Sequence, residues 1–582
     1  MGDTVMKLVP YKTSRQLISK FGGYNALHSA AYNEYSSTKN LTSDEFPYLR
    51  TRDRRGFIKS YGSITAFGAL DGLYCVDGTG FYYKDVYKGA VTAGEKVVVN
   101  SGAEVLIFPD NVSYNTANGG YKSLDMTFTQ SASATISVSK SDGTVYSGYT
   151  VSSSPPSEPS GGDMWIDTSG SFDVMKIFSE ETNLWTSIPS TYIKISTDGI
   201  DDDISQYDGI TISGCINNDI NGDYIVQYVG INYIILYGLI RTEITQAEGL
   251  TIKRTIPSMD YATVYNNRVW GCSSENHEVY ASKLGDPTNW NAYEGISTDS
   301  YAVTIASSGS FTGAITYGGY VMFFKENCIH RIFGNKPSNF EVNEIQYSGV
   351  KSGCSKSLAV VNGALYYLSV NGVMEYTGGY PEVISQKLGN TDMYSDATGC
   401  GFGDKYYLSM KDTSGTYKLF VFDTRKRLWH IEDDTRMKYA TYYNDDMFFI
   451  DASDDLYSVK GETGTKEDLL EWECISGIYG TETPDGKYVG KIQMMIDINY
   501  GSVFPYEEES TFNLDIEYNS EGIWNNLMSL RSESLRSYNI PVPIRRCDHF
   551  RIKIYGKGDF MLYNMMLELF EGGDYAATSR RS

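Results

Sequence analysis

One short pattern recurs along this chain and constrains its fold more than any other feature. It consists of a turn residue, a run of alternating aromatic and aliphatic residues, a second turn and a second such run. Copies of this pattern begin at Asp71, Gly102, Asn266, Gly318, Asn362, Gly403 and Asn444. The last five starts lie 41 to 52 residues apart. Such a period of short antiparallel strands is typical of propeller blades, because one blade cannot bury its inner face without neighbours.

The composition agrees with this repeat. Aromatic residues make up 14% of the 582 residues, with 49 tyrosines, and aromatic residues favour strands. We therefore predict an all-β fold: a six- or seven-bladed β-propeller with an inserted small-β region and a C-terminal β-sandwich domain. Tyr366, Tyr407 and Phe448 occupy equivalent places in successive hairpins, so we expect all three to be buried.

Breaks in the pattern predict the domain organisation. The period is interrupted by a Ser- and Thr-rich segment that contains the turn-rich stretch 152–163, and after about Val459 longer alternating strands appear, such as Phe512 to Tyr518. We predict an N-terminal arm at 1–55, the first part of the propeller at 56–124, inserted small β-domains at 125–255, the remainder of the propeller at 256–460, and the sandwich at 461–582. We expect that the insertion can be deleted without unfolding the propeller.

Two local segments allow more than one interpretation. The stretch from Leu17 to Tyr35 could form a short helix. The apolar run from Tyr224 to Ile240 has nearly the length of a membrane span but is interrupted by Gln227, Gly230 and Asn232. Two strands around a turn at residues 230–232 explain it better, so we expect no membrane span.

The formal net charge of −23 argues against tight binding to nucleic acid, which requires clustered Lys and Arg. An acidic wall can still line a pore for DNA, because it repels phosphates and lets a duplex pass without sticking. The eight cysteines are scattered singly, which indicates reduced and mostly buried thiols. The first 15 residues have no apolar core of signal-peptide length, so we expect synthesis in a cytoplasm and retention there until assembly or lysis.

No motif points to catalysis. The acidic run DGIDDDISQYDG (Asp198, Asp201, Asp202, Asp203, Asp208) could offer oxygen ligands to calcium, but it lacks the spacing of an EF-hand and is better explained as a solvated turn. The five histidines (His28, His277, His330, His430, His549) stand far apart. A faint sialidase-like box near Trp185 is not repeated from blade to blade, and no GxSxG, P-loop or GxGxxG–helix pattern occurs. We expect no cofactor, no metal and no enzyme activity.

Three stretches resemble a family of bacteriophage structural proteins. The first is 21–56, with an N-L-T-S-D turn, a Pro and an Arg-rich strand. The second is the blade from Asn266 that runs into KLGDPTNWN, and the third is 540–569 at the end of the chain. All three are similar to the tail nozzle or tail hub (tail tubular or stabilisation-type) β-propeller proteins of short-tailed bacteriophages.

The resemblance implies a structural virion protein of the tail, assembled in the host cytoplasm. Such subunits form a homohexameric ring that continues the DNA channel below the portal and adaptor, contacts tail fibres or other tail proteins, and passes or retains the genome without binding DNA tightly. Four arginines close together suit carboxylates on an acidic neighbour, so Arg50, Arg52, Arg54 and Arg55 are candidate inter-subunit contacts. The alternatives are a receptor- or glycan-binding tail component and, third, a glycan-cleaving propeller enzyme.

Overall fold

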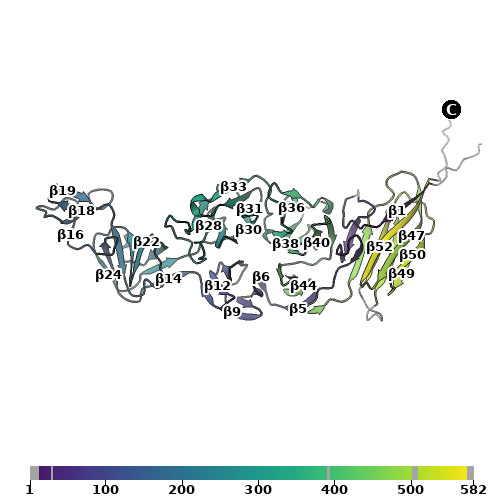
Figure 1. Ribbon diagram of the computed structural model, residues 1–582, viewed down its shortest axis with the longest axis horizontal. Coiled ribbons are helices and arrows are strands. Elements are labelled where there is room, and N and C mark those ends of the chain that lie inside the picture. The colour runs from purple at the N-terminus through teal and green to yellow at the C-terminus, as the bar shows by residue number, and fades with distance from the viewer. Residues whose placement is uncertain (1–11, 28–29, 390–393, 501–508, 573–582) are drawn as a thin grey trace, which may run out of the picture. The chain divides into compact units, whose positions relative to one another are not determined.

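The computed structural model describes residues 12–27, 30–389, 394–500 and 509–572, and Figure 1 shows that these residues are built from strands. The only helices among them are four 3-10 turns of three residues each: Asn218–Ile220, Pro337–Asn339, Ser355–Ser357 and Gln386–Leu388. By its contacts the chain divides into two compact units. The first comprises 1–95, 324–329 and 345–582, and the second 96–323 and 330–344. The predicted all-β class is confirmed.

Seven small antiparallel sheets give the fold its repeat among the described residues. Four belong to the first unit. One sheet consists of β6 (Ile64–Ala69), β7 (Leu73–Asp77), β8 (Gly80–Tyr83) and β9 (Val86–Ala90), and another of β34 (Ala359–Val361), β35 (Ala364–Ser369), β36 (Gly372–Tyr376) and β37 (Glu382–Val383). A third consists of β38 (Ser395–Phe402), β39 (Lys405–Lys411), β40 (Tyr417–Asp423) and β41 (Leu428–Ile431), and the fourth of β42 (Tyr439–Tyr443), β43 (Asp446–Ile450), β44 (Asp455–Ser458), β5 (Gly56–Ser60) and β45 (Thr465–Lys466). Three belong mainly to the second unit. One sheet consists of β10 (Val97–Ser101), β11 (Glu104–Phe108), β12 (Val112–Asn115) and β13 (Tyr121–Ser123), and another of β26 (Tyr261–Tyr265), β27 (Arg268–Ser273), β28 (Glu278–Ala281) and β29 (Tyr301–Thr304). The third consists of β30 (Phe311–Tyr317), β31 (Tyr320–Lys325), β32 (Ile329–Phe333) and β33 (Glu341–Ile345).

Six of these seven sheets follow the order of the chain, as propeller blades do, and the seventh places β5 between β44 and β45. Neighbouring blades contact one another through their first strands, in the series β34, β38, β42, β6 within the first unit and β10, β26, β30 within the second. Each of the seven hairpins recognised in the sequence supplies the second and third strands of one blade. The fold is a β-propeller, and the expected burial of Tyr366, Tyr407 and Phe448 is confirmed at 1%, 5% and 7% exposure.

One blade is completed by a strand from far away in the sequence. β5 pairs with β44 and with β45, so Gly56 lies opposite Ser458 and Phe57 opposite Tyr457. This pairing joins the start of the propeller to its end and covers the edge of β44 that would otherwise be open.

The closing strand depends on a glycine. A Cβ on Gly56 would overlap the carbonyl oxygen of Thr463. We expect Gly56→Ala to destabilise this blade by about 1–3 kcal/mol, because the backbone of the facing turn must move. Hydrogen exchange of β5 and β44 amides measures the effect. Gly379→Ala is the control, since a Cβ there meets nothing within 4 Å. Equal exchange in both variants would contradict this prediction.

Along the chain, the inserted region stands between the blade β10–β13 and the blade β26–β29. An eight-stranded sheet contains β14 (Met126–Thr129), β15 (Ala134–Ser139), β20 (Tyr192–Ser196), β21 (Gly209–Ser213), β22 (Gly222–Gly230), β23 (Tyr233–Tyr237), β24 (Ile244–Gln246) and β25 (Thr251–Arg254). A four-stranded sheet contains β16 (Tyr149–Ser152), β17 (Met164–Asp167), β18 (Val174–Ser179) and β19 (Leu184–Ser187). β22 and β23 form the predicted hairpin, and no helix among the described residues is long and apolar enough to cross a membrane.

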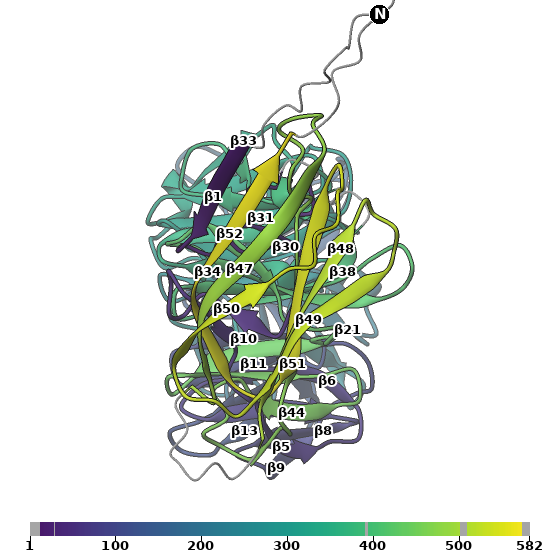
Figure 2. The ribbon, with the colours of Figure 1, turned by 90° about the vertical axis from the view of Figure 1, so that its right-hand side faces the viewer.

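The last part of the chain forms a sandwich of two sheets. One contains β1 (Lys12–Ile18), β3 (Leu41–Thr42), β4 (Leu49–Thr51), β52 (Phe560–Glu571), β47 (Lys487–Ile498) and β50 (Arg536–Pro541); the other contains β2 (Tyr35–Lys39), β46 (Glu471–Ser476), β51 (Phe550–Lys557), β48 (Thr511–Tyr518) and β49 (Trp524–Arg531). Figure 2 shows β1, β52, β47 and β50 side by side. Apolar residues of both sheets meet in one core.

The segment at 1–55, predicted as an arm, contributes four strands to this sandwich where it is described. The expected helix between Leu17 and Tyr35 is wrong: β1 ends at Ile18, β2 begins at Tyr35, and the described residues between them contain no helix. Pairing of Leu17 with Met566 and burial of Ile18 and Tyr35 in the core override the local helical tendency.

Candidate functional site

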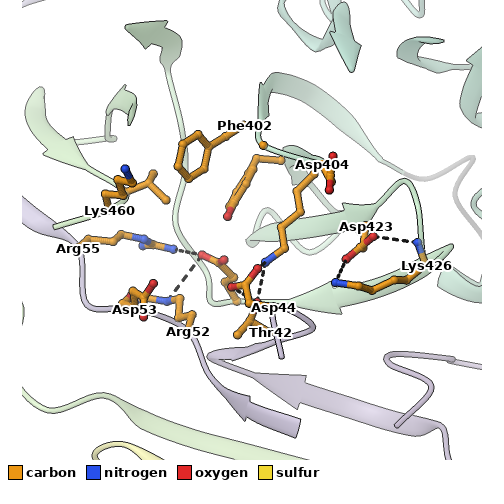
Figure 3. Close-up of a pocket in the computed structure, with 15 residues that line it drawn as sticks. Thr42, Asp44, Arg52, Asp53, Arg55, Phe402, Asp404, Asp423, Lys426 and Lys460 are labelled. Atoms are coloured by element: carbon orange, nitrogen blue, oxygen red, sulfur yellow. Dashed lines mark hydrogen bonds and ion pairs between the residues drawn. The ribbon is translucent and has the colours of Figure 1, made fainter. Parts of the chain in front are cut away.

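The arginine-rich segment predicted from the sequence borders a cavity of about 250 Å³, which we call the junction cavity. It is lined by Thr42, Asp44, Arg52, Asp53, Arg55, Phe402, Gly403, Asp404, Lys405, Tyr407, Asp423, Lys426, Glu432, Val459 and Lys460. The segment from β3 to β5 supplies one side and the blade β38–β41 much of the other. Figure 3 shows Arg52 and Arg55 at one end of the cavity and Asp423 with Lys426 at the other.

At the first end, two arginines share three carboxylates, and we call these five residues the arginine network. Arg55 places Nη2 2.7 Å from Glu432 Oε2 and Nη1 2.8 Å from Asp433 Oδ2. Arg52 places Nη1 2.8 Å from Glu467 Oε2 and Nη2 3.3 Å from Asp433 Oδ2. The side chains of Arg52, Arg55 and Glu432 are only 6%, 3% and 4% exposed. Planar guanidinium groups suit such a cluster because each can bond two carboxylates at once.

The pKa values in the network follow from these contacts. Burial by itself would raise the pKa of Asp433, but Arg55 and Arg52 lower it to about 2. Burial likewise opposes ionisation of Glu467, and Arg52 nevertheless lowers its pKa. Burial disfavours the charge of Arg55, yet the carboxylates of Asp433, Glu432 and Glu467 raise its pKa. Asp433, Glu467 and Arg55 therefore stay charged at neutral pH.

At the other end of the cavity, two lysines form ion pairs with aspartates. Lys405 Nζ lies 2.6 Å from Asp44 Oδ1 and donates to Thr42 Oγ1 at 2.6 Å. Lys426 Nζ lies 3.2 Å from Asp423 Oδ2 and donates to the Ser43 carbonyl oxygen at 2.9 Å. These bonds fasten the turn after β3 to β39 and to the end of β40. The arrangement is a set of mutually neutralised charges that holds one segment against a blade.

His430, on β41, interacts electrostatically with charged residues that line this cavity, namely Lys405, Asp423, Asp44 and Lys426. Burial, followed by the nearby Lys405 ammonium group, lowers its pKa to about 3. The ring therefore remains neutral at neutral pH. With His430 at about 3 and Asp433 at about 2, neither group is suited to exchange a proton near neutral pH.

All four predicted arginines find acceptors within the chain. Arg52 and Arg55 belong to the arginine network. Arg50 Nη1 lies 3.1 Å from Asp53 Oδ1, and Arg54 Nη1 donates to the Glu467 carbonyl oxygen at 3.4 Å. Contact of these arginines with a second subunit stays a prediction.

The sequence interpretation missed the carboxylate partners of these arginines. The carboxylates that Arg52 and Arg55 bind in the arginine network are 377 to 415 residues away along the chain. For Glu432 and Asp433, the sequence signal was the acidic group Glu432, Asp433 and Asp434 directly after the apolar stretch LWHI.

The acidic run at 198–208 is only partly a solvated turn. Asp198, Asp202 and Asp203 are exposed, as predicted, but for Asp208 the prediction is wrong because its exposure is 0%. Asp208 accepts hydrogen bonds from Arg254 Nη1 and Asn289 Nδ2, both at 2.5 Å. It therefore fastens the inserted sheet to the loop between β28 and β29.

The other chemistry-bearing residues remain dispersed. The described part of the chain contains no group of three His, Cys, Asp or Glu residues able to hold a metal ion. All eight cysteines are buried and unbridged, as expected for reduced thiols. His28 lies outside the described residues.

Comparisons with known proteins give only distant likenesses. No protein-family model matches the chain, and no curated protein matches it. Among solved structures, Kluyvelomyces marxianus Hsv2 is 9% identical with a TM-score of 0.24, over 50% of this chain and 90% of that one. The WD40 domain of Toxoplasma gondii coronin is 9% identical with a TM-score of 0.21, over 60% and 72%. Trypanosoma rangeli sialidase, an enzyme, is 10% identical with a TM-score of 0.22, over 96% of both chains. At these scores no activity or ligand carries over to this chain.

Proposed function

We propose that this chain is a structural subunit of the tail of a short-tailed bacteriophage, a nozzle or hub protein without enzymatic activity. The subunit forms a homohexameric ring that continues the DNA channel below the portal and adaptor. The ring passes or retains the genome and contacts tail fibres or other tail proteins. Its place is the tail of the virion, after assembly in the host cytoplasm.

The observation that carries this proposal is the arginine network beside the closing strand β5. A ring subunit that bears the pressure of packaged DNA has to resist opening of its propeller. Here the strand that closes the last blade is preceded by two arginines bonded to three carboxylates. The resemblance of residues 21–56 to nozzle proteins covers this same segment, which supports the proposal independently of the propeller itself.

The net negative charge of the subunit supports the proposal of a channel that does not bind DNA tightly. With a net charge of −23 on each subunit, a ring adds repulsive fields in its lumen, so phosphates are held away from the wall. Arg52 and Arg55, two of the four arginines in the Arg-rich segment, have their charges neutralised inside the chain. DNA passage through such a ring is fast and independent of base sequence.

We expect the purified full-length protein to assemble into rings of six times the 64.9 kDa subunit mass, measured by native mass spectrometry. Electron microscopy of the same sample should show an open centre. The ring should bind duplex DNA no tighter than micromolar at physiological salt, measured by fluorescence anisotropy. A monomer at all concentrations, or sub-micromolar affinity for DNA, would overturn the proposal.

A further inference from the structure

A second hollow, of about 420 Å³, lies where the inserted sheet meets the loop between β28 and β29. We call it the polar groove. It is lined by Gly209, Ile210, Thr211, Asp223, Tyr224, Ile225, Lys253, Thr255, Asn291 and Tyr293. Its size falls within the range of small-molecule sites.

The floor of the groove is a row of polar side chains. Asp223, Thr211 and Lys253 lie directly opposite one another on β22, β21 and β25, so they project from the same face of the sheet. Thr211 Oγ1 donates to Asp223 Oδ1 at 2.6 Å. Both residues are exposed, and the bond leaves the hydroxyl lone pairs and the second carboxylate oxygen as acceptors for a ligand. Neighbouring strands are about 4.8 Å apart, so the row spans roughly 10 Å, the length of two linked pyranose rings.

The rim of the groove is apolar. Ile225 is 38% exposed and Tyr293 is 44% exposed, so both keep accessible surface at the groove. An aromatic ring beside a row of hydrogen-bonding groups is suited to a ligand with an apolar face and a hydroxylated edge.

The groove is held open by the backbone. Gly209 donates its N–H to the Asn291 carbonyl oxygen at 2.8 Å, and a Cβ on Gly209 would approach Asn291 Cβ to 2.5 Å. Asn291 Nδ2 donates to the Thr255 carbonyl oxygen at 3.3 Å. Together with the bonds of Asp208, these contacts fix the loop that carries Tyr293 against the sheet, so the groove is formed without a ligand.

We propose that the polar groove binds a neutral saccharide of one or two pyranose rings. The Asp223 carboxylate and the Lys253 ammonium group offer acceptors and donors for vicinal hydroxyls, and Tyr293 offers a face for the C–H side of a ring. A phosphate or carboxylate ligand is disfavoured because the charge of Asp223 offsets that of Lys253, so the row carries no net positive charge. This binding role goes beyond the structural role in the ring and does not depend on assembly.

The test is saturation-transfer NMR on the full-length protein. The neutral probes are maltose, lactose, diacetylchitobiose and methyl rhamnoside, and the anionic probes are glucuronic acid and inorganic phosphate. We expect transfer to at least one neutral saccharide. Asp223→Ala should weaken its binding about tenfold through loss of a charged hydrogen bond, and Tyr293→Ala by a similar factor through loss of the stacking face.

Two exposed residues of the same region serve as matched controls. Tyr237→Ala and Asp203→Ala should leave the affinity within about twofold, because neither residue lines the groove. Asp223 is exposed, so Asp223→Ala tests the site even if Tyr293→Ala perturbs its loop. Absence of transfer from every neutral saccharide, binding of the anionic probes alone, or equal losses in groove and control variants would each overturn the proposal.

Discussion

Arg55→Ala is expected to destabilise the blade closed by β5 by about 3–5 kcal/mol, because removal of one partner leaves buried charges without compensation. The side chains left behind are Glu432, 4% exposed, and Asp433, 18% exposed. Hydrogen exchange of the amides in β5 and β44 should accelerate about a hundredfold or more, provided that they exchange by local opening of the blade. The sandwich core serves as an internal reference, since its strands exchange through other openings.

The control for this substitution is a surface ion pair in the same unit. Arg425 Nε lies 3.0 Å from Asp404 Oδ1, with the two side chains 70% and 41% exposed. Arg425→Ala should cost about 0–1 kcal/mol, because solvent screens an exposed pair. Arg55→Lys should fall between the two, since an ammonium group keeps the charge but cannot bond two carboxylates in one plane. Equal exchange in Arg55→Ala and Arg425→Ala would show that the arginine network does not hold the closing strand.

The repeat could be predicted from the sequence because its signals are local. Turn residues and alternating apolar residues lie within about 20 residues of one another, which is enough to specify the hairpin of each blade. The burial of Tyr366, Tyr407 and Phe448 followed directly from this. The closing strand could not be found in the same way, because the pairing of β5 with β44 joins segments about 400 residues apart. The sequence of a short strand such as Gly56–Ser60 does not specify the strand with which it pairs.

The site was predicted only in part, for a similar reason. The sequence was sufficient to predict that the arginine-rich segment binds carboxylates. It does not show whether those carboxylates belong to the same chain. Asp208 illustrates the opposite error. It stands in a run of exposed aspartates, and only the fold brings Arg254 and Asn289 to it. Local composition therefore gave the correct environment for Asp202 and Asp203 but not for Asp208.

Asp208→Ala is expected to release the inserted sheet from the loop between β28 and β29. The substitution leaves the Arg254 guanidinium group, only 12% exposed, without its carboxylate, at a cost of about 3–5 kcal/mol. It also removes the acceptor of the Asn289 amide and of the Ser205 N–H, which donates to Asp208 Oδ2 at 2.9 Å. Faster hydrogen exchange at residues 289–291 and in β21, together with new proteolytic cleavage near Thr255, should report the release.

Asp202→Ala is the matched control, because Asp202 lies in the same run but is exposed, and its loss should change stability by no more than about 0.5 kcal/mol. Asp208→Asn separates charge from shape: the side chain keeps its size and one acceptor oxygen, but it no longer neutralises the charge of Arg254. If the charge carries the attachment, Asp208→Asn should behave like Asp208→Ala; if shape carries it, Asp208→Asn should resemble the unaltered protein. Exchange at residues 289–291 that is unchanged in Asp208→Ala would mean that the backbone bond between Gly209 and Asn291 holds the insertion without the carboxylate.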